Sequence, residues 1–284
     1  MSTLEIKVWN DPVAFSKRVM PELLKKEAEN SLMIGVLENV KRGTYTTFHQ
    51  LTVEDEGQLL AILQVTPPHP LNYVVVERSQ AESIHATVIP ALLQLTIPFT
   101  EVVSEKSHAE AFATMWQKHT NEQATTFMAQ GLYRLDRVEN VDMAVGVMRR
   151  ATREDQALLE KWYRGFEQDS GLDASSDERM VAVVTSMIDN NDAFLWEVDG
   201  NPVSCAKRSR PTANGVTVSF VYTEPKHRGH GYARSLVAEL SRTLLGDKQF
   251  CTLYTDLTNP TSNKIYQEVG YRPIMESAWI RLAR

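Results

Sequence analysis

The chain has 284 residues, of which 43% are hydrophobic and 23% charged, a composition typical of a folded globular protein that excludes disordered, collagen-like and disulfide-rich classes. Asp and Glu total 36 against 30 Lys and Arg, giving a net charge of -6 that disfavours nucleic acid and anionic membranes as partners. No apolar run reaches the roughly 20 residues that a membrane helix needs, and no secretory signal is evident, so a cytoplasmic protein is expected.

The first half alternates between helical and strand-like patterns. Asp11-Pro12 is typical of a helix start, and the first forty residues read as helices that stop at Arg42-Gly43. Further along, the pattern predicts strands at 59–65, 73–76, 99–103 and 127–138, and helices at 81–95 and 109–118.

The pattern restarts near residue 140. A capping box from Thr152 to Asp155 opens a helix, and Asp199-Gly200 predicts a hairpin between antiparallel strands. The predicted strands of this half are 145–150, 194–198, 202–207, 216–222, 250–256 and 276–282, and its other helices are 176–188, 232–245 and 261–269.

The two halves therefore share nearly the same order of elements, which suggests an internal duplication. MAQGLYRLDR at 128–137 aligns without gaps to MESAWIRLAR at 275–284, although two amphipathic strands can also match by chance. We predict two domains, 1–139 and 140–284. The fold class is α/β of the α+β type, each domain having a mixed, mostly antiparallel sheet flanked by helices.

Two cysteines, Cys205 and Cys251, have no CxxC spacing and no neighbouring histidine cluster. In a chain without an export signal we expect reduced core thiols.

The most informative segment connects a predicted strand ending near Tyr222 to the helix that begins at Tyr232. Its loop contains Gly229 and Gly231, and glycine lets backbone N–H groups approach a ligand closely. The helix start adds unpaired N–H groups and a positive dipole end. The loop therefore predicts an anion site suited to a pyrophosphate, although a tight turn alone would also explain two glycines.

The spacing of this loop excludes two common nucleotide motifs. Residue 234 is Arg, so Gly-x-Gly-x-x-Gly is not formed, and no Gly-Lys-Ser/Thr follows. The loop instead resembles the signature of the GCN5-related N-acetyltransferases (GNAT), Arg/Gln-x-x-Gly-x-Gly/Ala, as Arg228-Gly-His-Gly-Tyr-Ala233.

A second element of that family's pattern follows downstream. Asn259 is followed by Tyr266 and then by Gly270-Tyr271. The resemblance covers roughly 144–284. The first half has Val76-Glu-Arg-Ser-Gln-Ala81 where the loop would be expected, without glycine, and resembles a degenerate copy. The resemblance thus implies tandem GNAT-like domains.

The resemblance implies an acetyl-CoA-dependent N-acetyltransferase that moves an acetyl group to an amine by direct attack in a ternary complex, without a metal. In the family's pattern the backbone of the loop binds the CoA pyrophosphate, the preceding strand end bonds the pantetheine arm and polarises the thioester carbonyl, and the Asn contacts the cofactor arm or helps to open the sheet. The matching residues are Arg228, Gly229, His230, Gly231, Tyr232 and Ala233 for the loop, Val221, Tyr222 and Thr223 for the strand end, and Asn259.

Tyr266 matches the family's tyrosine that protonates the departing thiolate, whereas its helical spacing alone favours a core aromatic. For the general base, Glu224 is the first candidate, and a solvated loop carboxylate is the simpler interpretation of it. His227 and Asp256 are weaker candidates, and a water chain without any side-chain base is an alternative.

The acceptor is a small-molecule or peptide amine of unknown identity. The loop at 167–176 contains Asp169 and Asp173, which either hold a cationic amine or belong to a solvated connector. Tyr163, Phe166 and Trp279 either line the cleft or lie in the core. The alternative function is a non-catalytic CoA-responsive binding or regulatory module; a nucleotide-dependent oxidoreductase is disfavoured by the glycine spacing. The oligomeric state stays open.

Overall fold

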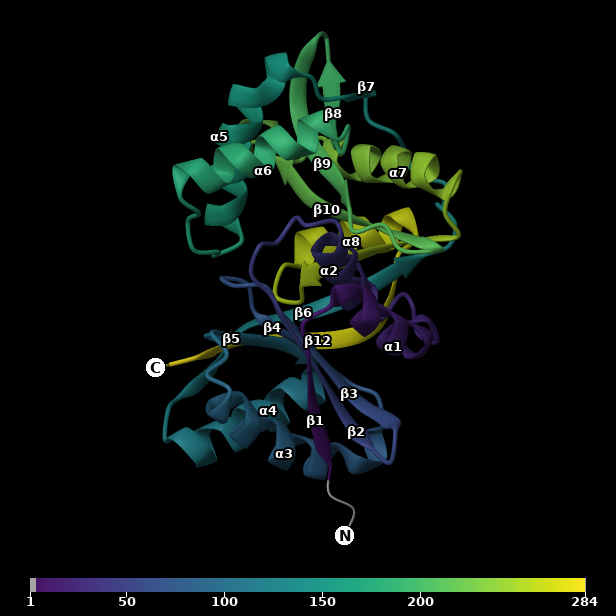
Figure 1. The fold of residues 1–284 in the computed structure, drawn as a ribbon. Coiled ribbons are helices and arrows are strands. Elements are labelled where there is room, and N and C mark those ends of the chain that lie inside the picture. Colours follow the sequence, from purple (N-terminus) through teal and green to yellow (C-terminus); the bar gives the residue numbers. More distant parts are fainter. Residues whose placement is uncertain (1–3, 284) are drawn as a thin grey trace. The chain divides into compact units, whose positions relative to one another are not determined.

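The computed structural model describes residues 4–283, and its two halves repeat one order of elements (Figure 1). The first run consists of β1 (Glu5–Trp9), α1 (Pro12–Leu24), α2 (Ser31–Lys41), β2 (His49–Asp55), β3 (Gln58–Val65), β4 (Leu71–Val75), α3 (Ala81–Gln94), β5 (Glu101–Glu105), α4 (Lys106–Thr120) and β6 (Ala124–Leu135). The second consists of β7 (Val147–Arg150), α5 (Gln156–Asp169), α6 (Asp177–Asp189), β8 (Ala193–Val198), β9 (Asn201–Ser209), β10 (Gly215–Thr223), α7 (Tyr232–Leu245), β11 (Phe250–Asp256), α8 (Pro260–Val269) and β12 (Arg272–Leu282). The predicted fold class is confirmed.

Two compact units divide the chain. One comprises the described residues up to Leu132, together with Thr255–Thr258 and the chain from Pro273 onward, and the other comprises the remainder. The predicted division at 139/140 places the last strand in the second domain. In the structure the last strand belongs to the first unit. Strand β12 pairs antiparallel with β5, where Ala278 faces Ser104, and so completes the sheet of that unit.

The first unit has a strand where the sequence pattern predicts a helix. Residues 5–9 were expected within a helical region, but β1 pairs antiparallel with β2 from Glu5↔Glu54 to Trp9↔Gln50. The strand is short and half-exposed, so its alternation is too weak to distinguish from a helical pattern. The helix predicted after it is confirmed, since Asp11 accepts a hydrogen bond from the Val13 N–H at 2.8 Å.

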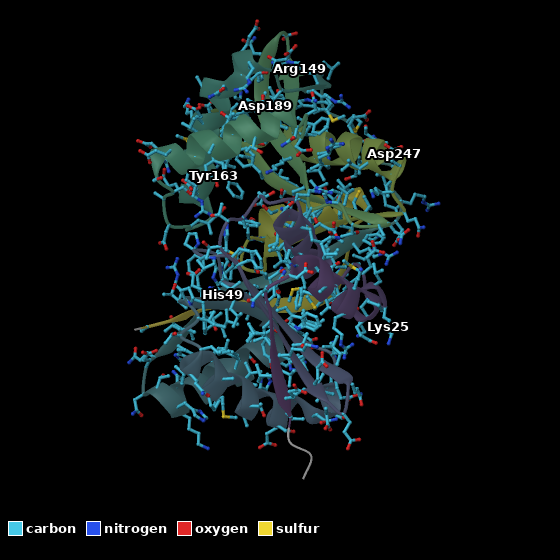
Figure 2. The ribbon with its side chains drawn as sticks, viewed as in Figure 1. Lys25, His49, Arg149, Tyr163, Asp189 and Asp247 are labelled. Carbon is cyan, nitrogen blue, oxygen red and sulfur yellow. The ribbon has the colours of Figure 1, made fainter. Side chains whose placement is uncertain are left out.

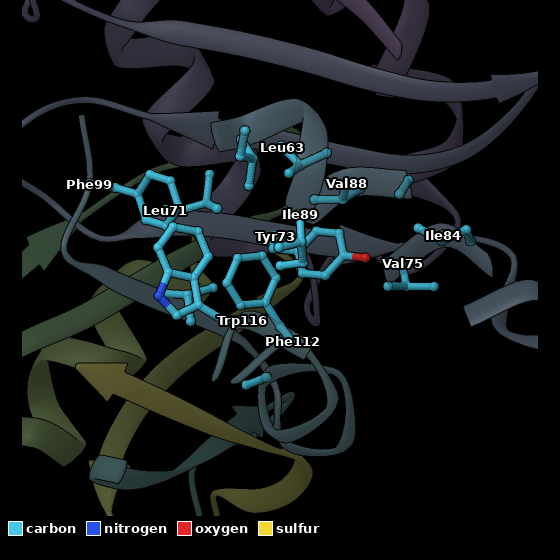
Figure 3. Packing of buried hydrophobic residues seen from close by; sticks show 14 of the residues in the cluster. Leu63, Leu71, Tyr73, Val75, Ile84, Val88, Ile89, Phe99, Phe112 and Trp116 are labelled. Atoms are coloured by element: carbon cyan, nitrogen blue, oxygen red, sulfur yellow. The ribbon is translucent and has the colours of Figure 1, made fainter. Parts of the chain in front are cut away.

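A group of aromatic side chains packs together within the mostly aliphatic core of the first unit, between its sheet and helices α3 and α4 (Figure 3). Phe112 lies between Tyr73 and Trp116, with ring centroids 5.7 Å and 6.0 Å away. All three side chains are almost completely buried, and such ring pairs add to the stabilisation from burial alone.

The second unit is organised around strands β7 to β11, antiparallel except for the parallel pair β10–β11. Leu195 of β8 packs under α5 and α6, whereas its neighbours Phe194 and Trp196 pack on the opposite face under α7 and α8. Alternate side chains point to opposite faces of a strand, so each face has its own layer of helices (Figure 1).

Both cysteines, Cys205 and Cys251, are buried and free, as expected for reduced core thiols. Burial raises the pKa of the Cys251 thiol to about 12, which keeps it protonated and unreactive at neutral pH.

Candidate functional site

Strands β10 and β11 separate partway along their length. Their parallel pairing runs from Gly215↔Phe250 to Thr217↔Thr252 and goes no further, although β10 continues to Thr223 and β11 to Asp256. The last part of β10 therefore presents an edge of backbone N–H and C=O groups that β11 does not pair. Such an edge can bind an extended chain of amides.

A β-bulge causes the separation. The register between β10 and β9 shifts between Ser219 and Tyr222, and Phe220 has φ +51, a backbone conformation that is unusual for a residue other than glycine. An extra residue in one strand bends that strand and disrupts its pairing.

Helix α5 holds the bulge in place. Phe220 packs against Tyr163 and Phe166, with ring centroids 5.5 Å and 5.3 Å away; Tyr163 is labelled on this helix in Figure 2. The ring of Tyr222 lies on Gly165, where a Cβ atom would come within 2.3 Å of the Tyr222 hydroxyl. Tyr163 and Phe166 thus pack against a core cluster.

The glycine loop follows the bulged strand. After a short turn at Pro225–His227, Gly229 has φ +83 and Gly231 has φ +77, a region that glycine occupies without strain. A Cβ atom at Gly229 would meet nothing within 4 Å, so the loop is open on that side.

Helix α7 begins directly at this loop. The Ser235 N–H donates to the Gly231 carbonyl at 3.0 Å, so the N–H groups of Tyr232, Ala233 and Arg234 precede the first helical bond. They carry the positive end of the helix dipole, which suits a phosphate group. The loop is at most partly buried.

Internal contacts fix the direction of this helix end. The Ser235 hydroxyl donates to the Gly231 carbonyl at 3.0 Å and accepts the Ala144 N–H at 2.7 Å. Arg234 binds Glu268 of α8 at 3.1 Å and the Asp142 carbonyl at 2.9 Å. The Arg234 guanidinium is therefore engaged with the protein.

The Arg228 side chain is also engaged with the protein. Its Nε donates to the Thr223 carbonyl at 2.9 Å, and its guanidinium pairs with Asp169 at the end of α5. Its own N–H donates to the Pro225 carbonyl at 3.2 Å. Asp169, predicted as a candidate for holding a cationic amine, is thus neutralised by Arg228.

The neighbouring carboxylate, Glu224, lies in an ion pair. Its Oε1 is 2.5 Å from Lys161 Nζ and its Oε2 is 3.4 Å from Lys226 Nζ. The hydrogen bond from Lys161 lowers the pKa of Glu224, and a carboxylate with a lower pKa is a weaker base. The assignment of Glu224 as general base stays a prediction, and this pairing weighs against it.

Two other residues that the sequence pattern singled out belong to the first compact unit. Asp256 accepts the Thr258 N–H at 2.8 Å and belongs to the first compact unit. Trp279 also belongs to that unit, where it packs against Phe127 at 5.1 Å.

Tyr266 lies on α8 and is 8% exposed. Burial raises the pKa of its phenol to about 12, partly offset by a hydrogen bond with the Ser262 side chain. The phenol is thus protonated throughout the neutral pH range. Asn259 caps the same helix, and its Oδ1 accepts the Ser262 N–H at 3.0 Å. Asn259 therefore positions Ser262, and Ser262 in turn positions Tyr266.

The first unit has a closed counterpart of this region. The parallel pairing of β4 and β5 ends at Asn72↔Val103, but the Ser104 hydroxyl donates to the Tyr73 carbonyl at 2.6 Å and bridges the two strands. Where the glycine loop would lie, Glu77 accepts the Ser79 N–H at 3.1 Å. A carboxylate at this position repels a phosphate group.

Among residues 4–283, no group of three or more His, Cys, Asp or Glu side chains is placed to hold a metal ion. In the same range no helix is long and apolar enough to cross a membrane.

Comparisons with known proteins agree with this geometry. Residues 204–280 match the family described as FR47-like protein. A GNAT-family acetyltransferase from Colwellia psychrerythraea aligns over 98% of this chain and 99% of its own, with 12% identity and a TM-score of 0.62. The chain has the GNAT fold. The resemblance stated from the two sequence elements is thereby confirmed, and the two repeated runs of elements are GNAT-like in their order.

Two further solved structures share this fold over nearly the whole chain, and the first of them is described as a tandem GNAT protein. A tandem GNAT protein from the clavulanic acid biosynthesis pathway covers 99% of both chains at 14% identity with a TM-score of 0.59. A GCN5-related N-acetyltransferase from Sphaerobacter thermophilus covers 98% of this chain and 95% of its own, at 13% identity and a TM-score of 0.64. The sequence matches no curated protein.

Sequence reasoning missed three residues that build this site. Gly165 had a usable signal, because a glycine inside a helix is costly and often marks a close contact. Ser235 is an ordinary small residue of an amphipathic helix. Phe220 has no signal, since an aromatic residue in a strand run predicts regular pairing.

Proposed function

We propose that this protein is an acetyl-CoA-dependent N-acetyltransferase that acts on a small-molecule or peptide amine. The observation that carries the proposal is the separation of β10 from β11 next to the open glycine loop. An unpaired strand edge suits the amides of a pantetheine arm, and the helix end suits a pyrophosphate. Acetyl-CoA would bind with its diphosphate on the N–H groups of Gly229–Ala233.

The thioester would lie along the edge of β10 at Val221–Thr223. A backbone N–H there would donate to the thioester carbonyl, which stabilises the negative charge that develops as the amine attacks. The amine nitrogen forms a bond with the carbonyl carbon, and the carbon–sulfur bond then breaks. The role of the chain is to orient these groups and to keep the donors in place.

Two protons move in this reaction. We assign Tyr266 as the acid that gives its phenolic proton to the departing thiolate, which its protonated state at neutral pH supports. The proton lost by the attacking amine passes to water, with Glu224 as the side-chain alternative. The low pKa of Glu224, paired with Lys161, favours the water route.

The first unit would serve as scaffold. Its Ser104–Tyr73 bridge and its Glu77 carboxylate leave it without the open strands and the glycine loop. We therefore place acetyl-CoA in the second unit alone.

The test measures binding and turnover separately. Calorimetry with acetyl-CoA should show one site per chain, and CoA thiol release should depend on an added amine. Binding without turnover for any amine in a broad panel would favour a CoA-responsive module instead, and no binding at all would refute the proposal.

A further inference from the structure

The sheet face under α5 and α6 changes from apolar to polar along its length. Near the helices it carries apolar side chains, among them Leu195, Cys205 and Phe220. Beyond them the same face carries Lys207 and Ser209 of β9, which pair with Ser219 and Thr217 of β10. Residues directly opposite each other in an antiparallel pair share a face. The Ser209 and Ser219 hydroxyls, 3.0 Å apart, confirm this for one diagonal pair.

Lys207 is a cation without a counter-ion on this face. It is partly buried, and burial lowers the pKa of its ammonium group. The carboxylate that influences it, Asp192, is bound by Arg208 Nε at 2.6 Å. Across residues 4–283, no carboxylate lies within 4.0 Å of the Lys207 ammonium. An ammonium withdrawn from water without a partner is unfavourable, and an anion beside it would relieve the cost.

The position of Lys207 connects it to the bulge. It lies opposite Ser219, the residue after which the register of β10 shifts. The pairing of β10 with β11 ends two residues earlier, at Thr217, and in the proposed function the thioester lies at the other end of the shift, along Val221–Thr223. Lys207 and the two serine hydroxyls thus adjoin the reaction centre on the face covered by α5 and α6.

Two carboxylates of α5 are paired with arginine side chains. Asp169 pairs with Arg228, and Glu167 pairs with Arg164 at 2.9 Å while accepting the Ser175 N–H at 3.0 Å. Arg210 adds a further positive charge that acts on Lys207. Lys207 is thus better suited to an anion than the paired Asp169 is to the cationic amine considered from Asp169 and Asp173.

We propose that the acceptor is an amine that carries a carboxylate, which Lys207 binds together with the hydroxyls of Ser209 and Ser219. This inference rests on the proposed function and specifies its substrate class as amino-acid-like. Lys207 is a specificity residue: it holds the non-reacting end of the acceptor and takes no part in bond breaking. The positive charge of one ammonium group balances the negative charge of one carboxylate, and the serine hydroxyls donate further hydrogen bonds to that carboxylate.

The experiment compares matched amines with acetyl-CoA as donor: lysine with cadaverine, phenylalanine with phenethylamine, and alanine with ethylamine. We expect kcat/KM for at least one amino acid to exceed that of its decarboxylated partner by about tenfold or more. Lys207→Met should reduce this ratio to near one by raising KM for the amino acid, while KM for acetyl-CoA is unchanged. Lys207→Arg should retain part of the preference.

Controls separate a binding role from a structural one. Lys118→Met, at an exposed lysine of α4, should leave the ratio unchanged. Lys207→Met should not lower the melting temperature, because it removes a partly buried charge that has no ion-pair partner. The N-acetylated amino acid should raise the melting temperature of the wild type and not that of Lys207→Met.

The inference is overturned if no amino acid is preferred over its decarboxylated partner, or if the ratio is unchanged in Lys207→Met. Acetyl-CoA binding and turnover of simple amines in the same preparation would show that the proposed function holds although the inference fails. If no amino acid is acetylated and no N-acetylated amino acid stabilises the protein, the inference is wrong even where simple amines are turned over.

Discussion

Gly165 of α5 and Tyr222 of β10 fit together so closely that a Cβ atom at position 165 would lie 2.3 Å from the Tyr222 hydroxyl and 2.7 Å from its ring. Position 165 lies inside a helix, where glycine is less favourable than alanine by about 1 kcal/mol. The contact explains why glycine is present there despite that cost. It also ties the helix to the bulge that parts β10 from β11.

The first prediction follows from this contact. Gly165→Ala should destabilise the protein by about 1–3 kcal/mol, because overpacking outweighs the gain in helix propensity. It should also weaken acetyl-CoA binding by displacing β10. Thermal unfolding and calorimetry measure the two effects.

A double variant provides the control for this prediction. Gly165→Ala with Tyr222→Leu should be less destabilised than the sum of the two single changes, because the smaller side chain removes the collision. Additive losses would show that the contact with Tyr222 is not the cause.

The second prediction tests the loop. Gly231→Trp should abolish acetyl-CoA binding, because its indole would occupy the space in front of the helix N–H groups. Its matched control is Gly200→Trp in the β8–β9 turn, where φ is +76, close to the +77 of Gly231, and a Cβ atom would meet nothing within 4 Å. Both variants carry similar backbone strain, so a loss of binding in Gly231→Trp alone would come from the position of its indole. Unchanged acetyl-CoA affinity in Gly231→Trp would refute the loop assignment.

The third prediction separates backbone from side chain at Arg228. Its guanidinium binds Asp169 and the Thr223 carbonyl, so we expect Arg228→Ala to change acetyl-CoA affinity less than about threefold, the range of an exposed ion pair. Calorimetry checks this value. A loss of about a hundredfold would mean that the side chain turns to the diphosphate on binding.

The fourth prediction concerns Tyr266. Tyr266→Phe should lower kcat by about 10²–10⁴, the range for a general acid, with little change in acetyl-CoA affinity. Because the pKa of the phenol is raised to about 12, the wild-type rate should show no loss of the acid form between pH 7 and 10. Equal losses of rate and affinity in the variant would indicate a packing role.

The fifth prediction concerns acid stability of the first unit. His85 is 2% exposed and bonds Tyr73 through Nδ1 at 2.9 Å, and burial lowers its pKa from 6.5 to about 4. The unfolded chain therefore takes up the proton first as pH falls. Stability is fully present above pH 6.5 and is lost toward pH 4, by up to about 3 kcal/mol.

The comparison for this prediction uses two histidines. His85→Gln, which preserves a partner for Tyr73, should flatten the dependence of unfolding free energy on pH between 6.5 and 4. The same change at the exposed His119 should leave the slope unaltered. An identical slope in His85→Gln would show that other groups control acid unfolding.

Local chemistry made much of the fold predictable. The helix at Tyr232–Leu245 and the strand at Phe250–Asp256 have the predicted bounds, because an amphipathic period and a compact apolar run are both strong patterns. The capping box at Thr152 and Asp155 is formed as expected. These features depend only on neighbours within a few residues.

Long-range contacts made the rest unpredictable. The pairing of Arg228 with Asp169, 59 residues apart, decides where a loop cation points, and no local pattern encodes it. The same holds for Lys161 and Glu224. The bulge at Phe220 depends on the contacts of its ring with Tyr163 and Phe166 of α5. The sequence thus located the candidate site, whereas the partners of its charged groups required the structure.

The pairing of β12 with β5 has a consequence for synthesis. Ala278 and Trp279 complete a sheet whose first strand is made more than two hundred residues earlier. A ribosome must therefore translate β12 (Arg272–Leu282) before that sheet can close, whereas most of the other unit has already emerged. The order of translation and the order of maturation are reversed for these two units, and deleting β12 would harm the one that was translated first.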